Sequence, residues 1–418
     1  MSRASALRLL CFLGAALAAF AIEVGVGAEA DQQKFQQIEH GRYLTTLADC
    51  VACHTRKDGG NPFAGGRPLE TPFGTIVTPN ITPDRETGIG NWTDEQFDNA
   101  VRRGIRADGS RLFPAMPYPY YTKMSHDDVM AIRAYLATIQ PVHNPVVANQ
   151  LPFPVNVRLN MRVWDGLFFE QGEFKPDPNK SAQWNRGAFL VTGPGHCGAC
   201  HTAKNFLGAD KKSDALQGGQ VQGWFAPDIT NDQAHGLGAM SIDDIVALLK
   251  TGHNEVATVT GPMAEEVEDS SAYFKDDDLK AIATYLKSLP GSDKKETSLD
   301  PSDPRMAAGK AIYRDTCSAC HGLDGNGVAN LFPALAKAPS VRSKDPTSAI
   351  RVILRGARSV ATQAEPTAPA MPSFAWQLKD DQVAAVATYI RNSWGKAAAP
   401  VSADDVAKEK TKLANRGD

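Results

Sequence analysis

The sequence has little of several features that assign a protein to a class at once. Its 44 Lys plus Arg against 47 Asp plus Glu leave a net charge of −3, which gives no electrostatic reason to bind nucleic acid. Beyond the first thirty residues, no apolar run approaches the roughly twenty residues that a membrane-spanning helix needs. With 7 Cys in 418 residues, a disulfide-dense scaffold is disfavoured. The 42% hydrophobic and 22% charged residues indicate a globular chain of several domains.

The first thirty residues have the pattern of an export signal. Two arginines precede an apolar run from Leu9 to Ile22, and Ala28-Glu29-Ala30 provides the small residues of a cleavage site. We therefore predict a signal peptide over residues 1–30, whose removal also discards Cys11. A retained membrane helix is the weaker alternative, because the apolar run is shorter than the roughly twenty residues that span a bilayer. The mature protein is predicted to be exported, and then soluble or held peripherally at a membrane.

The other six cysteines fall into three identical patterns, Cys-x-x-Cys-His, which are the attachment signature of c-type haem. Two thiols on one helical turn each add to a vinyl group of the same porphyrin, and the adjacent His lies beneath the iron as its proximal ligand. We therefore predict three covalently bound haem c groups. The predicted haem-binding residues are Cys50, Cys53 and His54; Cys197, Cys200 and His201; and Cys317, Cys320 and His321.

Zinc and disulfide bonds are the alternatives for these cysteines. Zinc sites of four cysteines usually separate their Cys pairs by about 15 to 20 residues, whereas Cys53 and Cys197 lie 144 positions apart. Disulfides are compatible with an exported protein, but they do not explain a His after every second Cys. Haem is the better explanation, and it agrees with export because bacteria attach c-type haem outside the cytoplasm.

Each motif lies inside a repeated helical unit. A helical lead-in with an early glycine, Gly41, Gly187 or Gly309, precedes the motif, and a second helix with acidic residues at its start closes the unit. The sequence therefore predicts an all-α fold of three tandem class I cytochrome c-like haem domains. Their predicted bounds are residues 31–143 (unit one), 181–290 (unit two) and 304–395 (unit three).

Three segments lie outside these units. Residues 291–303 form a polar linker with one proline. Residues 144–180 carry a Trp and several Phe, too many aromatic residues for a free tether. We expect this aromatic strap to pack between units one and two, the alternative being a surface for a partner or the membrane. Residues 396–418 are rich in Ala, Lys and Asp and are predicted to form a polar, mobile tail.

A cytochrome with both axial positions filled needs a second ligand, commonly Met. Met116 and Met263 each follow their motif histidine by 62 positions, and Met371 follows His321 by 50. We predict these three methionines as axial metal ligands beside His54, His201 and His321. The alternative for any lone Met is core packing, and Met240 competes with Met263.

The remaining ring nitrogen of a metal-bound His usually donates to a fixed acceptor. We hypothesise that the carbonyls of Pro79, Pro227 and Pro333 accept these hydrogen bonds, the alternative being ordinary loop prolines. The other histidines are expected to be surface or structural residues. They are His40, His126, His143, His196, His235 and His253.

Further motifs carry a resemblance over nearly the whole mature chain. They are Thr71-Pro72-Phe73-Gly74-Thr75-Ile76, Asn80-Ile81-Thr82-Pro83-Asp84, Gly88-Ile89-Gly90-Asn91-Trp92, Pro114-Ala115-Met116-Pro117-Tyr118, Leu151-Pro152-Phe153-Pro154, Trp184-Asn185-Arg186-Gly187 and Gly261-Pro262-Met263-Ala264-Glu265. With the three haem motifs, the chain resembles the tri-haem cytochrome c subunit of bacterial membrane-bound alcohol, gluconate, sorbitol and fructose dehydrogenases.

This resemblance implies an electron-transfer subunit at the periplasmic face of the inner membrane. It implies a partner dehydrogenase subunit with FAD or PQQ, a possible small third subunit, peripheral membrane association, and ubiquinone as the electron acceptor. We expect no catalytic residues in this chain, because it lacks a dinucleotide fingerprint and a metalloprotease motif and shows no recognisable Ser-His-Asp pattern. The alternatives are a stand-alone multihaem enzyme of peroxidase type and a haem subunit that serves a terminal oxidase.

Overall fold

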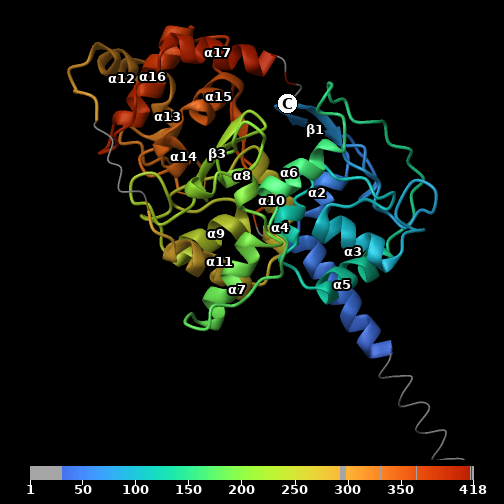
Figure 1. The fold of residues 1–418 in the computed structure, drawn as a ribbon. Coiled ribbons are helices and arrows are strands. Elements are labelled where there is room, and N and C mark those ends of the chain that lie inside the picture. The colour runs from blue at the N-terminus through green and yellow to red at the C-terminus, as the bar shows by residue number, and fades with distance from the viewer. Residues whose placement is uncertain (1–30, 292–297, 330, 364, 415, 417–418) are drawn as a thin grey trace, which may run out of the picture.

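The computed structural model describes residues 31–291, 298–329, 331–363, 365–414 and 416. The predicted signal peptide with Cys11, and residues 292–297 of the predicted linker, lie outside the described residues. The described part is mainly helical, with three two-stranded antiparallel hairpins, and this confirms the all-α prediction (Figure 1). No helix in it has the length and apolar character needed to cross a bilayer.

Unit one starts with a helix over residues 31–47 and closes with α5 (His126–Leu136). The start of α5 is fixed by a capping box, in which the Ser125 side chain accepts from the backbone of Asp128 and the Asp128 side chain accepts from the backbone of Ser125. The elements between these helices are α2 (Cys50–His54), β1 (Pro68–Thr71), β2 (Gly74–Val77), α3 (Asp94–Arg103) and α4 (Tyr118–Tyr121).

Unit two repeats this plan between α7 (Ala182–Thr192) and α11 (Asp276–Ser288). Three acidic residues in the first turn of α11 favour its N-terminus electrostatically. The elements between are α8 (Gly198–His201), η1 (Lys212–Asp214), β3 (Gln217–Val221), β4 (Trp224–Asp228), α9 (Ile242–Thr251), α10 (Pro262–Asp269) and η2 (Ser271–Tyr273).

Unit three lies between α12 (Pro304–Thr316) and α16 (Asp380–Asn392). Its hairpin is short, with two residues in each strand, whereas the β3–β4 hairpin of unit two has five. The elements between α12 and α16 are α13 (Ser318–His321), α14 (Pro339–Arg342), α15 (Thr347–Arg355), β5 (Ala357–Arg358) and β6 (Ala370–Met371).

In every unit the lead-in helix crosses the closing helix at its early glycine. A Cβ on Gly41 would lie 1.8 Å from the Ala131 carbonyl oxygen. The corresponding Cβ would lie 2.0 Å from the Ala281 oxygen at Gly187 and 2.2 Å from the Ala385 oxygen at Gly309. Because no side chain fits there, the three glycines allow two helix backbones to touch and set the same crossing in each unit.

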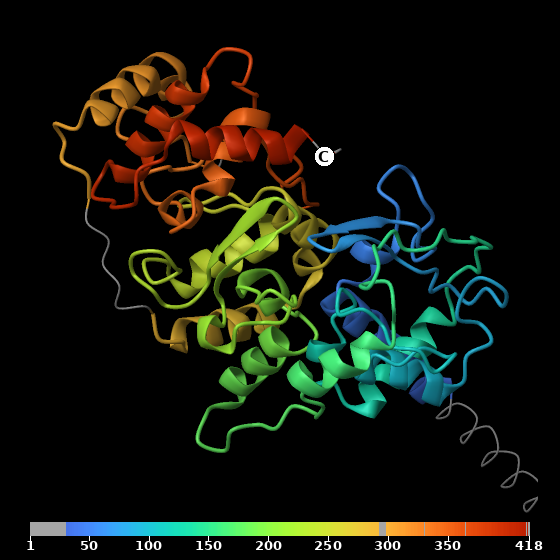
Figure 2. The ribbon, with the colours of Figure 1, turned by 45° about the horizontal axis from the view of Figure 1, so that its top comes forward.

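Units one and two share one hydrophobic core. Leu47 and Ile132 of unit one lie in the same buried cluster as Leu190, Leu279 and Ala283 of unit two. Figure 2 shows unit two, in green and yellow, between the blue and teal unit one and the orange and red unit three.

Unit three has a separate core, built around Tyr313, Ile350 and Val386. It meets unit two through a smaller cluster, in which Val360 packs against Val259 and Val267.

The aromatic strap packs against both units that it connects. Its helix α6 (Asn160–Phe168) buries Trp164 against Tyr118 of unit one and Ala209 of unit two. Further along, Phe174 lies edge-on against Phe189 of unit two, with ring centroids 5.7 Å apart.

The prediction of a mobile tail is wrong for the described residues after 395. They form α17 (Ala403–Ala414), which packs on α15 and α16 and buries Val401, Val406 and Leu413 to 2% exposure or less. These apolar residues are spaced so that they reach the core of unit three, although the surrounding composition is dominated by Ala, Lys and Asp. The tail is therefore part of the third unit's core.

Candidate haem-binding sites

The three Cys-x-x-Cys-His motifs adopt the same local structure. Each lies on a single helical turn directly after the lead-in helix, as α2, α8 and α13. On such a turn, the two thiols and the histidine are presented close together. None of the six motif cysteines forms a disulfide in the described structure, so all six thiols are available for thioether bonds.

Each motif histidine is fixed by the carbonyl that the sequence predicted. Nδ1 of His54 donates to the Pro79 carbonyl oxygen at 2.7 Å, and Nδ1 of His201 donates to that of Pro227 at 2.7 Å. Nδ1 of His321 donates to the Pro333 carbonyl at 3.1 Å. The hypothesis of proline acceptors is therefore confirmed in all three units. Because Nδ1 carries the proton, Nε2 is left with a free lone pair, as an iron ligand requires.

The protonation states of these residues suit haem. Burial lowers the pKa of His54, His201 and His321, which keeps the imidazoles neutral and able to bind a metal. Burial likewise raises the pKa of Cys50 and Cys197 to about 12.

No three His, Cys, Asp or Glu side chains in the described ranges come together as a metal-ion site. The donor set therefore fits covalent haem better than zinc.

The candidate axial methionines differ from their competitor in burial. Met116, Met263 and Met371 are only partly buried, at the edges of apolar clusters, whereas Met240 is 3% exposed inside the shared core. Met263 lies in the first turn of α10. Met240 thus has a packing role that accounts for its position.

The first two motifs lie against each other across the junction of units one and two. Tyr121 of α4 donates from its hydroxyl to the Ala48 carbonyl at 2.5 Å, and its ring lies edge-on to the His196 ring with centroids 5.7 Å apart. Burial is the main cause that raises the pKa of Cys53 to about 12, and the Cys200 thiol of unit two adds to this shift. The two haem-attachment turns are therefore close neighbours.

Three carboxyl groups lie at this same junction, and sequence reasoning missed them. Asp49 precedes the first motif with φ of 48°, and its buried Oδ1 has no hydrogen-bond partner. Burial raises its pKa well above the usual value, and the nearby Glu266 and Asp269 of α10 add to the shift. Burial also raises the pKa of Glu266 to about 7. The sequence signal was weak, because acidic residues in a polar helix normally face solvent.

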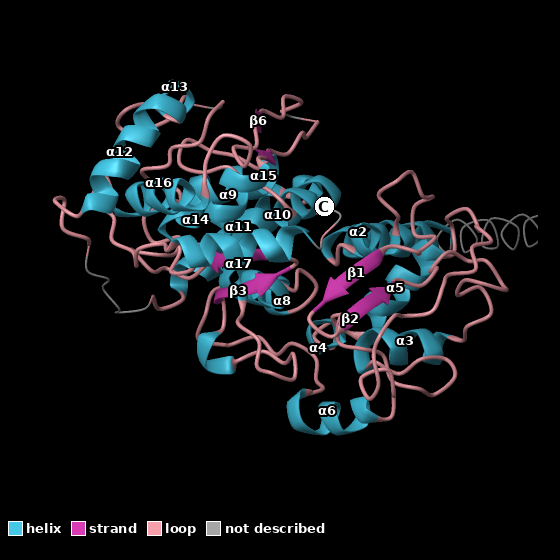
Figure 3. Ribbon diagram, turned by 90° about the horizontal axis from the view of Figure 1, so that it is seen from above, coloured by secondary structure: helices cyan, strands magenta, loops and turns pink. Residues whose placement is uncertain are grey.

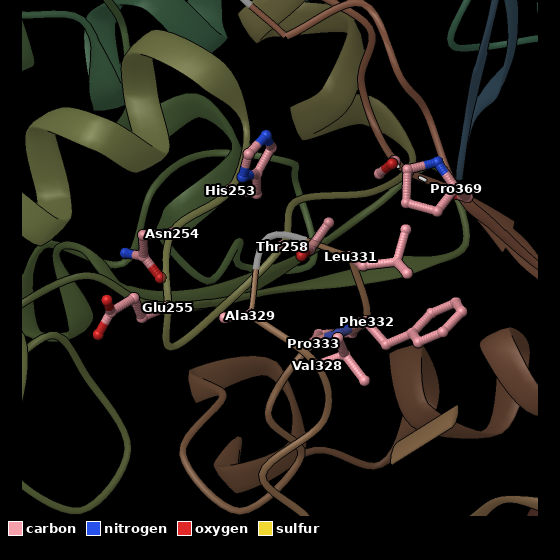
Figure 4. A pocket seen from close by; sticks show the side chains of 11 residues that line it. His253, Asn254, Glu255, Thr258, Val328, Ala329, Leu331, Phe332, Pro333 and Pro369 are labelled. Carbon is pink, nitrogen blue, oxygen red and sulfur yellow. Dashed lines mark hydrogen bonds between the residues drawn. The ribbon is translucent and has the colours of Figure 1, made fainter. Parts of the chain in front are cut away.

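The third motif adjoins unit two at a small, open cavity (Figure 4). His253 and Thr258 line it from unit two, and Leu331, Phe332 and Pro333 line it from unit three. Pro333 is the residue whose carbonyl holds His321. The proximal side of the third motif therefore faces unit two.

Comparisons with known proteins agree with this geometry. The cytochrome c family pattern matches residues 38–140 and 306–394. The chain is 41% identical over 412 residues to the alcohol dehydrogenase (quinone) cytochrome c subunit of Gluconacetobacter polyoxogenes, covering 94% of this chain and 88% of that protein. The chain belongs to this family of dehydrogenase cytochrome c subunits. As a cytochrome c, it binds haem c covalently.

Two further relatives show how widely this cytochrome c subunit family is used. The gluconate 2-dehydrogenase cytochrome c subunit of Pantoea cypripedii is 40% identical, with 93% of each chain covered. The fructose dehydrogenase cytochrome subunit of Gluconobacter japonicus is 38% identical over 88% of this chain and 82% of that protein. Because these relatives serve dehydrogenases with different substrates, the common feature is the electron-carrying chain.

Proposed function

We propose that the chain holds three covalent haem c groups and passes electrons from a partner alcohol or sugar dehydrogenase subunit to membrane ubiquinone. In each unit the two motif thiols would hold the porphyrin and the motif histidine would bind its iron. Met116, Met263 and Met371 would be the second iron ligands of their units. The haem supplies the one-electron chemistry, and the chain fixes and tunes it.

The observation that carries this proposal is the threefold repetition of one arrangement. A free Cys pair, a buried neutral histidine and a proline carbonyl that fixes Nδ1 recur in every unit. A disulfide site gives no reason for the carbonyl, whereas a histidine that binds iron needs its ring orientation and tautomer fixed.

The arrangement of the units supports an electron route through unit two. The first two attachment turns meet at Tyr121 and His196, and the third faces unit two across the cavity at Pro333. With both axial positions filled at each iron, no position is left for oxygen or peroxide, which disfavours a peroxidase. We place the mature chain at the periplasmic face of the inner membrane, with an FAD or PQQ dehydrogenase subunit and a possible small third subunit as partners.

The first test counts the haems and identifies their ligands. Purified chain from a host that attaches c-type haem should carry three haems per polypeptide and remain low-spin in both oxidation states. It should be reduced by its dehydrogenase partner with substrate and should in turn reduce a ubiquinone analogue. Two haems, or a high-spin iron that binds cyanide or carbon monoxide readily, would contradict the all-methionine arrangement.

The second test separates the methionine ligands from core methionines. Met371→Ala should leave the third haem attached while its iron loses the Met spectrum and its potential falls, because thioether ligation raises the potential. In unit two, Met263→Leu should change one haem in the same way. The matched control is Met240→Leu, a near-isosteric core change that should leave all three spectra unchanged. The reverse pattern would make Met240 the ligand.

A further inference from the structure

Helix α6 of the aromatic strap is apolar on both of its faces. A helix of a globular domain normally turns its large apolar side chains inward, yet α6, which lies at the periphery of the molecule in Figure 3, carries such side chains on its outer face as well. Its inner face is accounted for by the buried Trp164, and by Met161 and Phe168 that pack against the same cluster. Its outer face is covered by nothing in the described chain.

The inner contacts hold α6 rigidly in place. Trp164 donates from Nε1 to the Leu207 carbonyl of unit two at 3.0 Å. Asp165 accepts from the Tyr118 hydroxyl at 2.6 Å and pairs with Arg111 of unit one at 3.3 Å. The outer face is therefore presented by a fixed helix.

The outer face forms a ridge of large aliphatic side chains at four-residue spacing. Leu159, Val163 and Leu167 are 66%, 66% and 64% exposed. Two loop tips extend the ridge, Phe153 with 81% exposure and Phe206 with 85%. Three large apolar side chains on one helix face, with two exposed Phe on the adjoining loops, form the kind of surface that marks an interaction site.

Both loop tips are tied to α6 by hydrogen bonds. Asn160 donates from Nδ2 to the Pro154 carbonyl at 2.9 Å, which fixes the loop that carries Phe153. The Trp164 bond to Leu207 fixes the loop that carries Phe206. Both loop tips therefore adjoin α6, and we call the five exposed side chains together the α6 ridge.

We propose that the α6 ridge docks the protein on a phospholipid bilayer, with its apolar side chains inserted at the boundary between headgroups and acyl chains. This inference rests on the proposed function, because delivery of electrons to a membrane quinone needs the chain at the bilayer surface. It names the segment that makes this contact.

The shape and charge of the ridge favour lipid over a protein partner. Its aromatic residues stand on protruding loop tips, which enter a fluid acyl layer without needing a preformed complementary pocket. Arg162 is exposed on α6 itself, next to Val163. Cationic side chains beside an inserted apolar face are attracted to anionic headgroups.

The test uses the full haem-loaded chain and vesicles of two compositions, phosphatidylcholine alone and phosphatidylcholine with phosphatidylglycerol. The triple variant Leu159→Gln/Val163→Gln/Leu167→Gln should lower the vesicle partition coefficient at least tenfold for both compositions. These side chains are exposed, so the haem spectra and the unfolding temperature should be unchanged. The matched control is Leu323→Gln/Trp376→Gln, which removes exposed apolar side chains of 66% and 80% exposure from unit three and should have no effect.

The charge contribution is measured separately. Arg162→Gln should weaken binding about fivefold on vesicles with phosphatidylglycerol and leave binding to phosphatidylcholine alone unchanged. Unchanged partition of the triple variant would overturn the proposal. So would a triple variant that binds vesicles normally but no longer binds the dehydrogenase subunit, because the ridge would then be a protein interface.

Counting the haems distinguishes a failure of the docking proposal from a failure of the proposed function. If the chain carries fewer than three haems, the electron route fails while a positive vesicle result still assigns the ridge. If the chain carries three haems and the ridge variants bind vesicles normally, the electron route stands and the docking proposal fails.

Discussion

Units one and two are joined by a common core, whereas unit three is attached to unit two mainly at its surface. Burial of Leu47 and Leu190 in one cluster makes the first two units a single folding body. At the other junction, a small apolar cluster around Val360 and a set of hydrogen bonds link two separate cores. The same repeated unit is therefore assembled in two ways within one chain.

The difference has a consequence for electron transfer. Transfer between haems depends on their separation, so a shared core fixes the relation of the first two attachment turns. Tyr121 and His196 lie directly between these turns and fill the junction with aromatic rings. Unit three is joined to unit two by a smaller apolar cluster, and we therefore expect the relation of the third motif to unit two to be easier to change by mutation.

The crossing glycines provide the strongest way to separate the two kinds of assembly. Gly309→Ala should destabilise unit three by about 3 kcal/mol or more, because the new Cβ meets the Ala385 carbonyl. Units one and two should keep their stability. Gly187→Ala should instead destabilise units one and two together, since they share a core.

Thermal unfolding followed at the haem absorption bands and by calorimetry would check this prediction. Gly395→Ala is a control for the loss of a glycine, because a Cβ there would meet no atom within 4 Å. Its φ of 77° adds only local backbone strain. If Gly187→Ala left unit one at its original melting temperature, units one and two would not form a single folding body.

Much of the fold was predictable from the sequence because its pattern is repeated. The lead-in and closing helices follow from helical periodicity and acidic N-termini, and α5, α11 and α16 occur where these signals place them. The proline acceptors were predictable because the chemistry of an axial histidine requires a partner for Nδ1. Local and chemical signals were therefore sufficient for the parts of each site that lie within one unit.

The contacts between units could not be predicted from the sequence. Nothing in the residues near Asp49 or Glu266 indicates that a junction buries both, because each lies in a segment that is polar in its own unit. The tail was misjudged for a related reason. Val406 and Leu413 pack in the core only because α15 and α16 offer a surface there, and average composition does not reveal such a surface.

The buried Glu266 at the shared junction predicts an unusual pH dependence. Burial raises its pKa from 4.5 to about 7, so the folded state holds a proton that the unfolded state has already lost between these values. Stability from this group is therefore lost as pH rises from about 4.5 to 7. Glu266→Gln should be more stable than the parent by up to about 3 kcal/mol at pH 8 and equal to it near pH 4.

Denaturant unfolding of the haem-loaded protein at several pH values would measure this difference. Glu255→Gln is the control, because Glu255 is exposed and lies outside the junction. Glu266 faces Asp269, Ser271, Asp49 and the second motif's thiols. A pH-independent difference between Glu266→Gln and the parent would show that folding does not raise the pKa of this carboxyl.

A smaller effect is expected at the polar contact between units one and two. Asp278 of unit two accepts from the Tyr43 hydroxyl of unit one at 2.7 Å and from Arg186 at 2.7 and 2.8 Å. Burial alone would raise the pKa of Asp278, but these donors outweigh it and hold the pKa below its usual value. This stabilisation is present above the ordinary pKa of 3.8 and is lost as pH falls below it.

Asp278→Ala should therefore cost about 2 kcal/mol at neutral pH, and units one and two should lose stability together. Asp277→Ala, at the exposed neighbouring position, should cost only a few tenths of a kcal/mol through the helix N-terminus. Chemical denaturation at pH 7 and pH 3 distinguishes them, because only the Asp278 effect should shrink in acid. If the two variants had equal effects on the free energy of unfolding, the Asp278 contacts would not contribute to the stability of the shared core.

The weakest predicted effect lies at the junction of units two and three. The Ser348 hydroxyl accepts from the Phe225 backbone N–H at 2.9 Å and donates to the Phe225 carbonyl at 3.0 Å. Ser348→Ala leaves both buried backbone groups without this partner, and we expect a loss of about 1 kcal/mol. Because the interface is small, the loss should lower the unfolding temperature of unit three while units one and two change little.

Ser340→Ala, at an exposed position of α14, is the control. If Ser348→Ala instead lowered the stability of all three units equally, units two and three would unfold together, as units one and two are expected to do. The two junctions would then differ only in the residues that form them.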